Sequence, residues 1–353
     1  MRFFVSFLCV LCSIVVRLFF VVRSYIAKSL PAAYTICIYP VKPPMDMLLT
    51  DDQLLQLLQD TFGSEVRLVN SQVGKRAHDY LVLIAQLERP ALKVVIKIAG
   101  PEAPLASQFE RTAMLQDLVR RETNIPMPET HAVNMSFERW PWRYVIKTFL
   151  EGEMWVAVRD QLTEQERSAA FRQLGHAVAQ LHQIGFPAYG ELRADGSVQA
   201  EPDYLTAFSG RARRSIISDH LFASFLEALE RRGGLFVGVA QPVLCHEDLH
   251  GYNILFERDK NSWRLATIID FDKAWAGHNQ IDLARMDIWK GMTSRAFWEA
   301  YHEIHPVDPL YAERRPLYQL LWCFEYAENT AEHLADTQRL CNELGVKFEG
   351  RFE

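Results

Sequence analysis

The stretch Cys245-His246-Glu247-Asp248-Leu249-His250-Gly251-Tyr252-Asn253, with Asp270 seventeen residues after it, decides the fold of this chain. Short apolar segments typical of β-strands precede Cys245, follow Asn253 and lead into Asp270. Two such strands joined by a polar turn form a hairpin, so we expect Asn253 and Asp270 at the same end of it. An acid, an amide and a second acid in one place suit a hard cation such as Mg²⁺, and they leave one carboxylate, Asp248, to handle a proton.

The composition is that of an ordinary globular protein. The chain has 353 residues, enough for about two domains, with 49% hydrophobic and 23% charged residues. Its formal net charge of −6 argues against a nucleic-acid-binding protein, which would usually present a basic face. Six cysteines without regular spacing do not form a disulfide framework.

The amino terminus carries an apolar run, residues 3–22, of about the length of a membrane span. It is either a membrane anchor or an upstream false start, with Met45 or Met47 as the true first residue. A signal peptide is disfavoured because Arg17 interrupts the run. We therefore expect residues 1–44 to lie outside the globular domains, and a cytoplasmic protein whose only membrane contact would be that anchor.

The first half of the chain changes from a helical pattern to a strand pattern. Residues 49–62 have the leucine spacing of a helix, which Asp51 or Asp52 could cap. Short β-rich runs follow at 81–84 and 94–98.

Lys97 lies inside the second of these runs, and Glu110 lies in the first turns of a helix predicted over 105–120. A strand lysine followed by a helix glutamate is the ion pair that holds nucleotide phosphates in kinases. Taken alone, each residue is also typical of a solvated edge or helix surface. Between Asn70 and Tyr80 the sequence predicts a polar loop with one glycine, Gly74.

The second half is mostly helical, and we place the boundary between the lobes near residue 150. A polar insert at 188–203, with a turn at Asp195-Gly196, interrupts the helices. Trp289, Trp298, Trp322, Phe324 and Tyr326 recur in the last helices and are more typical of a helical core than of a stacking platform. The predicted helices cover 163–184, 216–232, 281–290, 294–304 and 314–344, the last with a break near Asn329.

The order of these parts is that of a kinase. A strand lysine and a helix acid come first, then His-x-Asp-x-x-x-x-Asn at 246–253, then Asp270-Phe271-Asp272 where protein kinases have Asp-Phe-Gly. A protein kinase is disfavoured because no Ala-Pro-Glu motif follows and the connection from Asn253 to Asp270 is short. Over roughly residues 65–330 the sequence resembles the aminoglycoside phosphotransferase family, small-molecule kinases grouped with choline and fructosamine kinases.

This resemblance implies an α+β, two-lobed protein-kinase-like fold. The N-terminal lobe, 45–150, would hold an antiparallel sheet with one main helix and bind the nucleotide. The C-terminal lobe, 151–353, would be larger, mostly helical, and would carry the catalytic loop and the acceptor site.

The resemblance also implies ATP and Mg²⁺ as cofactors. Asp248 would be the catalytic carboxylate, and Asn253 and Asp270 would bind the metal. Asp272 could assist the metal or bond locally, and the sequence does not choose between these roles.

The nucleotide would be bound by residues of the N-terminal lobe. Lys97 would contact its phosphates, positioned by Glu110, and Gly74 would lie in a nucleotide loop that has one glycine where protein kinases have three. The backbone of Thr148 and Leu150 could face the purine base.

The partner implied is a small molecule with a hydroxyl group, and nucleic acid is not expected. His246 is more typical of a structural residue than of a proton carrier, His182 of a helix-end contact, and His250 could lie near substrate. The alternative function is a non-catalytic, kinase-like binding protein. A polycationic aminoglycoside would need acids, for which the candidates, otherwise solvated, are Glu151, Glu153, Asp282, Asp287, Glu325 and Glu328.

Overall fold

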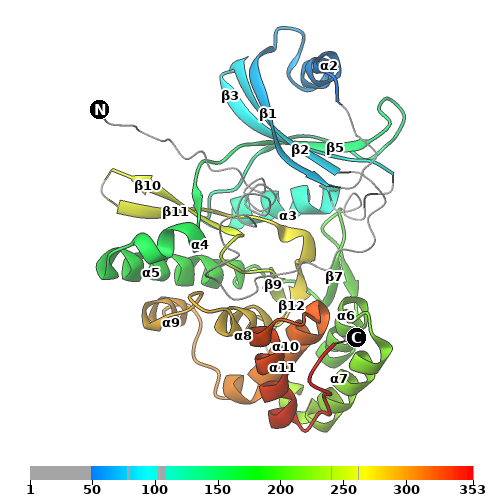
Figure 1. Ribbon diagram of the computed structural model, residues 1–353, viewed down its shortest axis with the longest axis vertical. Helices are drawn as coiled ribbons and strands as arrows, with labels where there is room; N and C mark the ends of the chain where they lie inside the picture. Colours follow the sequence, from blue (N-terminus) through cyan, green and yellow to red (C-terminus); the bar gives the residue numbers. More distant parts are fainter. Residues whose placement is uncertain are drawn as a thin grey trace. The chain divides into compact units, whose positions relative to one another are not determined.

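The computed structural model describes residues 49–77, 80–101, 103, 109–239, 241–260 and 262–352, so the predicted terminal segment 1–44 lies outside the described residues. The chain divides into two compact units (Figure 1). The described part of unit 1 covers 49–118 and 126–153, and that of unit 2 covers 119–125 and 154–352. In these ranges no helix has the length and apolar character needed to cross a membrane.

Unit 1 is built on a five-stranded antiparallel sheet with the order β1-β2-β3-β5-β4. Apolar residues of the central strands and three leucines of α2 form its core, which Trp142 and Tyr144 complete. The elements are α2 (Asp51–Phe62), β1 (Arg67–Ala77), β2 (Tyr80–Arg89), β3 (Leu92–Ala99), α3 (Phe109–Glu122), β4 (Thr130–Asn134) and β5 (Arg143–Thr148).

The cap of α2 is Thr50, and the prediction of Asp51 or Asp52 is wrong. Thr50 Oγ1 accepts a hydrogen bond from Gln53 N at 3.2 Å, and Gln53 Oε1 accepts one from Thr50 N at 3.0 Å. This reciprocal pair satisfies two backbone donors at the helix start. The two aspartates lie in the first turn instead, where negative charge complements the helix dipole.

The polar loop predicted between Asn70 and Tyr80 is also wrong, because residues up to Ala77 continue strand β1. The register with β2 shifts between Val73 and Lys75, which makes Gly74 a bulge. Since β1 is an edge strand, its outer residues face water and the sequence lacks the apolar alternation that marks an inner strand.

Unit 2 is mainly helical. Its helices are α4 (Trp155–Val158), α5 (Glu164–Leu181), α6 (Tyr204–Ser215), α7 (Asp219–Arg231), α8 (Gln280–Ile288), α9 (Arg295–His302), α10 (Tyr311–Tyr326) and α11 (Ala331–Leu344). Its short strands are β7 (Gly190–Leu192), β8 (Val198–Ala200), β9 (Val243–Cys245), β10 (Ile254–Asp259), β11 (Ser262–Ile268) and β12 (Trp275–Gly277), and β6 (Glu153–Met154) lies where the units divide. The predicted helices are confirmed to within a few residues, and the polar insert contains the β7–β8 hairpin with its turn at Asp195.

Helix α6 was not predicted. Its buried residues Tyr204, Ala207, Phe208, Arg211 and Ala212 follow helical spacing. A glycine in the middle and several arginines weaken that pattern in the sequence. In the structure α6 packs its aromatic residues into the main core of unit 2, with residues of α7 and α10.

Candidate active site

The hairpin β10–β11 brings Asn253 and Asp270 to the same end, as predicted. Ile254 pairs with Ile268, and Ile269 N donates to Asn253 O at 2.9 Å. Asp270 is therefore the residue directly after Ile269, whose backbone is hydrogen-bonded to Asn253.

Two residues of this site adopt left-handed backbone conformations. Glu247 has a φ of 60° and Asp270 a φ of 71°. Residues other than glycine rarely adopt such angles, and they are kept where the surroundings impose them, often at functional sites. These unusual backbone angles occur within the 246–253 motif and at Asp270, the two segments that the sequence analysis singled out.

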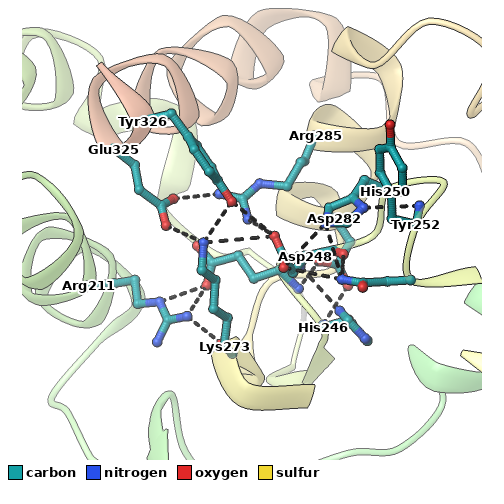
Figure 2. Close-up of polar contacts among 12 residues, drawn as sticks. Arg211, His246, Asp248, His250, Tyr252, Lys273, Asp282, Arg285, Glu325 and Tyr326 are labelled. Atoms are coloured by element: carbon teal, nitrogen blue, oxygen red, sulfur yellow. Dashed lines mark hydrogen bonds and ion pairs between the residues drawn. The ribbon is translucent and has the colours of Figure 1, made fainter. Parts of the chain in front are cut away.

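One side of the Asp248 carboxylate faces its own loop (Figure 2). Asn253 Nδ2 lies 3.2 Å from Asp248 Oδ2 and 3.0 Å from Asp248 O. His250 Nε2 lies 3.6 Å from the same Oδ2. The predicted catalytic acid and the predicted metal-binding amide are therefore in direct contact.

The other side of Asp248 faces residues that the motif does not contain. Tyr326 OH donates to Asp248 Oδ1 at 3.2 Å, while Lys273 Nζ and Arg285 Nη1 lie at 3.8 and 3.7 Å from it. Glu325 joins the two cations, with 2.6 Å to each (Figure 2).

These neighbours keep Asp248 ionised. Burial acts to raise the pKa of its carboxyl, but the contact with His250 and the charges of Lys273 and Arg285 outweigh it, so the pKa lies well below its usual range. Such a carboxylate accepts a hydrogen bond from a hydroxyl readily and holds a proton weakly.

Asp282 of α8 holds the loop that carries Asp248 in place. Its carboxylate accepts hydrogen bonds from the backbone of His246 at 2.7 Å and of Glu247 at 2.6 Å, and His182 Nε2 lies 3.2 Å from it. Burial acts to raise the pKa of Asp282, but its bond with His182 and the backbone bonds lower it overall. Asp282 is fully buried, so it anchors the loop and cannot bind an acceptor.

His246 is structural, as predicted. Its Nε2 donates to Ile269 O at 3.0 Å, and its Nδ1 accepts from Asp248 N at 3.2 Å. Burial lowers its pKa. Both ring nitrogens are thus used by a neutral imidazole. His182 likewise ends α5 and bonds Tyr301 OH at 2.9 Å.

A buried ion pair holds the same loop on another side. Arg211 of α6 donates to Glu247 Oε2 at 2.7 Å, to Glu191 Oε1 at 2.9 Å and to Lys273 O. Burial raises the pKa of Glu247, and Arg211 partly offsets this. This arginine connects the loop that carries Asp248 with the segment that follows Asp270.

Unit 1 holds the residues predicted to bind the phosphates. Lys97 lies half-buried in the centre of β3, between Val82 and Val145 of the neighbouring strands. Glu110 is exposed in the first turn of α3, off the buried face of that helix. In the neighbouring strand β5, Lys147 Nζ donates to Gln116 Oε1 of α3 at 2.6 Å.

Backbone hydrogen bonds within unit 1 leave fewer groups that could bind the purine base than the sequence predicted. Thr148 N donates to Glu129 O at 2.9 Å, so this N–H is not available to a base, while Leu150 lies just beyond β5. Gly74 lies within β1 rather than in a loop.

The residues present fit Mg²⁺. Asn253 directs Nδ2 toward Asp248, which leaves Oδ1 for a ligand, and Asp270 supplies a carboxylate from the same hairpin end. Amide and carboxylate oxygens are the donors that this ion prefers. Within the described part of the chain no group of three His, Cys, Asp or Glu residues has a metal-binding arrangement.

The sequence motifs missed the residues that surround Asp248. Lys273 is three residues after Asp270 and could have been noticed, but Arg211, Arg285 and Glu325 have no fixed spacing from the motif. The packing of α8 and α10 brings Arg285 and Glu325 to the site, and α6 brings Arg211 to the neighbouring Glu247.

Comparison with solved structures places these two units in a known class. A candidate fructosamine-3-kinase of Thermobifida fusca aligns with a TM-score of 0.60 and 17% identity, over 83% of this chain and 99% of that one. An ADP-bound aminoglycoside phosphotransferase gives 0.57 and 17%, over 84% and 100%. A thermostable aminoglycoside phosphotransferase mutant in a complex with AMP-PNP and hygromycin B gives 0.56 and 16%, over 83% and 96%. At these identities the likeness shows the fold, which is the predicted α+β protein-kinase-like one.

The sequence comparisons define the family. The model of the phosphotransferase enzyme family matches residues 71–317, more than half of the chain, and the chain belongs to that family. A probable ketoamine kinase of Synechocystis sp. is 27% identical over 164 residues, 42% of this chain and 52% of the relative. The chain thus spans about half the length of that curated relative.

Proposed function

We propose that this protein transfers the γ-phosphoryl group of ATP to a hydroxyl group of a small molecule. The arrangement that carries the proposal is Asp248 in contact with Asn253, beside Asp270, on a loop held by Asp282. The names of the similar proteins support it, since they are kinases of ketoamines, fructosamines and aminoglycosides.

Asp248 would orient the acceptor hydroxyl and take its proton as the new bond forms. Because its pKa is held low, it would remain ionised at neutral pH and act mainly by alignment and charge. This is adequate for phosphoryl transfer, whose transition state is loose and asks for little proton removal in advance.

Asn253 Oδ1 and the Asp270 carboxylate would hold Mg²⁺, which neutralises phosphate charge when bound. Lys97 is proposed to contact the nucleotide phosphates, and Leu150 remains the better candidate for the base. Because Glu110 is exposed in α3, we propose that it contributes less to the positioning of Lys97 than the sequence predicted.

The test is Asp248→Asn, which keeps the size of the side chain and removes its charge. With Mg·ATP and a panel of aminoglycosides, ketoamines, choline and sugars, we expect the variant to lower turnover of any accepted substrate by roughly a hundredfold or more. Binding of Mg·ATP should persist in calorimetry, and the exposed control Asp52→Asn should match the unchanged protein. Near-normal turnover by Asp248→Asn would contradict the assignment.

A further inference from the structure

A series of aromatic rings runs from one neighbour of the Asp248 carboxylate to another. Ring centroids are 5.5 Å apart for Tyr326 and Trp322, 5.2 Å for Trp322 and Trp289, and 5.7 Å for Trp289 and His250. Both ends of the series reach Asp248, through Tyr326 OH at 3.2 Å and His250 Nε2 at 3.6 Å. These four rings, called the aromatic arc below, therefore start and finish at the same carboxylate.

The rings that the arc takes from α10 and from the end of α8 are only partly buried. Trp289, Trp322 and Tyr326 are half-buried, whereas Phe324, on the same helix as the last two, is 1% exposed. Tyr252, 48% exposed, extends the arc outward from His250, with ring centroids 5.9 Å apart. Trp322 also packs against the main core of unit 2, and Phe324 belongs to that core, as expected. Partly exposed aromatic rings beside a reactive group are suited to covering a ring-shaped or apolar body.

Two buried N–H donors near the arc make no hydrogen bond to a described residue, although one of them, Arg285 Nη1, lies 3.7 Å from Asp248 Oδ1. Arg285 Nη1 and Trp289 Nε1 are buried, and neither has a hydrogen-bond partner in the described part of the chain. The two residues are one helical turn apart, with Trp289 N bonded to Arg285 O at 3.4 Å, and Arg285 is 3% exposed. Buried donors normally find an acceptor, so these two call for an oxygen-bearing ligand or water.

The cations beside Asp248 are Lys273 and Arg285, and the carboxylates of Asp248 and Glu325 balance them. Among the residues that the structure describes, Glu325 is the one acid other than Asp248 that pairs directly with Lys273 and Arg285. The Lys273 side chain is 34% exposed and remains reachable.

Three of the six acids that a polycation could use are already engaged. Glu325 is held by two cations, Asp282 is buried under the catalytic loop, and Asp287 is paired with Arg315 at 3.0 Å. An amino group of a polycationic acceptor, bound beside the aromatic arc, would lie near the positive charges of Lys273 and Arg285.

Resting on the proposed function, we infer that the acceptor is a hydroxylated ring compound with an acidic group, such as a carboxylate or a phosphate. Its ring lies against the aromatic arc, and its acidic group is bound by Lys273 and Arg285. The hydroxyl oxygen forms a bond to the γ-phosphorus, the bond to the β-phosphate oxygen breaks to release ADP, and the hydroxyl proton passes to Asp248. No oxidant or reductant is required.

The first test works with an acceptor of unknown identity. A deproteinised yeast extract is separated on ion-exchange resins into anionic, neutral and cationic pools, supplemented with D-glucuronate, D-glucose and kanamycin respectively. Each pool is incubated with the full chain, Mg²⁺ and γ-³³P-labelled ATP, and labelled products are counted after chromatography. We expect label in the anionic pool.

The possible outcomes test the anionic acceptor and the proposed phosphotransferase function separately. Label confined to products from the neutral or cationic pool would leave the phosphotransferase proposal standing and overturn the anionic acceptor. Label in no pool would contradict both. The Asp248→Asn variant, run in parallel, shows that the label depends on this site.

The second test distinguishes acceptor recognition from support of Asp248. Lys273→Gln should raise the KM for an acidic acceptor roughly ten- to a hundredfold, the value of one charge-assisted hydrogen bond, with little change in the KM for ATP. It should also reduce the preference for that acceptor over its neutral analogue. The control is Lys347→Gln, whose side chain is 87% exposed. A fall in kcat alone, equal for acidic and neutral acceptors, would mean that Lys273 only positions Asp248 and would overturn the inference.

Discussion

Among single residues, His278 shows how strongly the interior of unit 2 acts on an ionisable group. It is 1% exposed, and its Nδ1 lies 2.8 Å from Tyr318 OH. Burial, followed by the charge of Arg314, lowers its pKa to about 3. The folded protein therefore keeps this imidazole neutral where an unfolded chain would protonate it.

This difference makes stability depend on pH. Between the ordinary histidine pKa of about 6.5 and the folded value, the unfolded state holds the extra proton, so the free energy of unfolding falls as the pH is lowered. The slope from this residue approaches about 1.4 kcal/mol per pH unit. We expect His278→Gln to be less sensitive than the unchanged protein in urea unfolding measured from pH 7 to pH 5.

Other groups titrate in the same range, but they do so in both proteins, and the comparison removes them. The exposed His220→Gln variant should keep the original pH dependence. Parallel slopes for His278→Gln and the unchanged protein would show that His278 is already protonated, or equally neutral, in both states.

At this scale the sequence predicted the motif residues and missed their surroundings. Asp248, Asn253 and His246 occupy one loop, so their spacing alone implied their proximity. Glu110 shows the limit, because the sequence left open both a partner of Lys97 and a solvated helix acid, and the side chain is exposed. A one-residue error in helical phase turns a side chain by about 100°, and the sequence did not fix that phase.

Among the elements, the crossing of α5 and α9 depends on a helical glycine. A Cβ on Gly175 would overlap the carbonyl oxygen of Phe297 and lie 3.1 Å from Ala300 Cβ. The two helices can approach this closely because Gly175 has no side chain. His182, at the end of α5, is thereby kept beside Tyr301 of α9 and beside Asp282.

Gly175→Ala should destabilise the protein by about 1–3 kcal/mol, since overpacking moves backbone or forces poor rotamers. Gly210→Ala is the matched control, because Gly210 also lies inside a helix and its Cβ would meet only the end of the Arg214 side chain, at 3.6 Å. That change should be neutral or stabilise by up to about 1 kcal/mol.

Urea unfolding of both variants checks the pair. A stable Gly175→Ala variant with unchanged turnover would show that α5 and α9 can separate without effect on the catalytic loop. The sequence predicted α5 from its capping box and apolar stripe, yet it contained no sign of this close approach, which only the facing helix defines.

For the whole molecule, the sequence predicted the class because the catalytic motif is local and its parts follow one another in a fixed order along the chain of 353 residues. The surroundings of Asp248, where we propose that the acceptor binds, were not predictable in the same way. Lys273 precedes β12, Arg285 lies in α8 and Glu325 in α10. These residues are far apart in sequence and come together only when unit 2 folds. The aromatic arc could not be told from a core by composition, since the same tryptophans would suit either.

The terminal segment 1–44 is the part of the molecule furthest from this chemistry in sequence. The family match begins at residue 71, and the predicted and observed site residues lie between Gly74 and Tyr326. We therefore expect a chain that starts at Met45 to keep kcat/KM within about twofold, because residues 1–44 precede the family match and all of the site residues. Turnover and the urea midpoint of both chains measure this, and sedimentation with lipid vesicles shows whether the longer chain alone binds membranes. A short chain that folds, binds Mg·ATP and yet loses most of its turnover would mean that residues 1–44 contribute to the acceptor site.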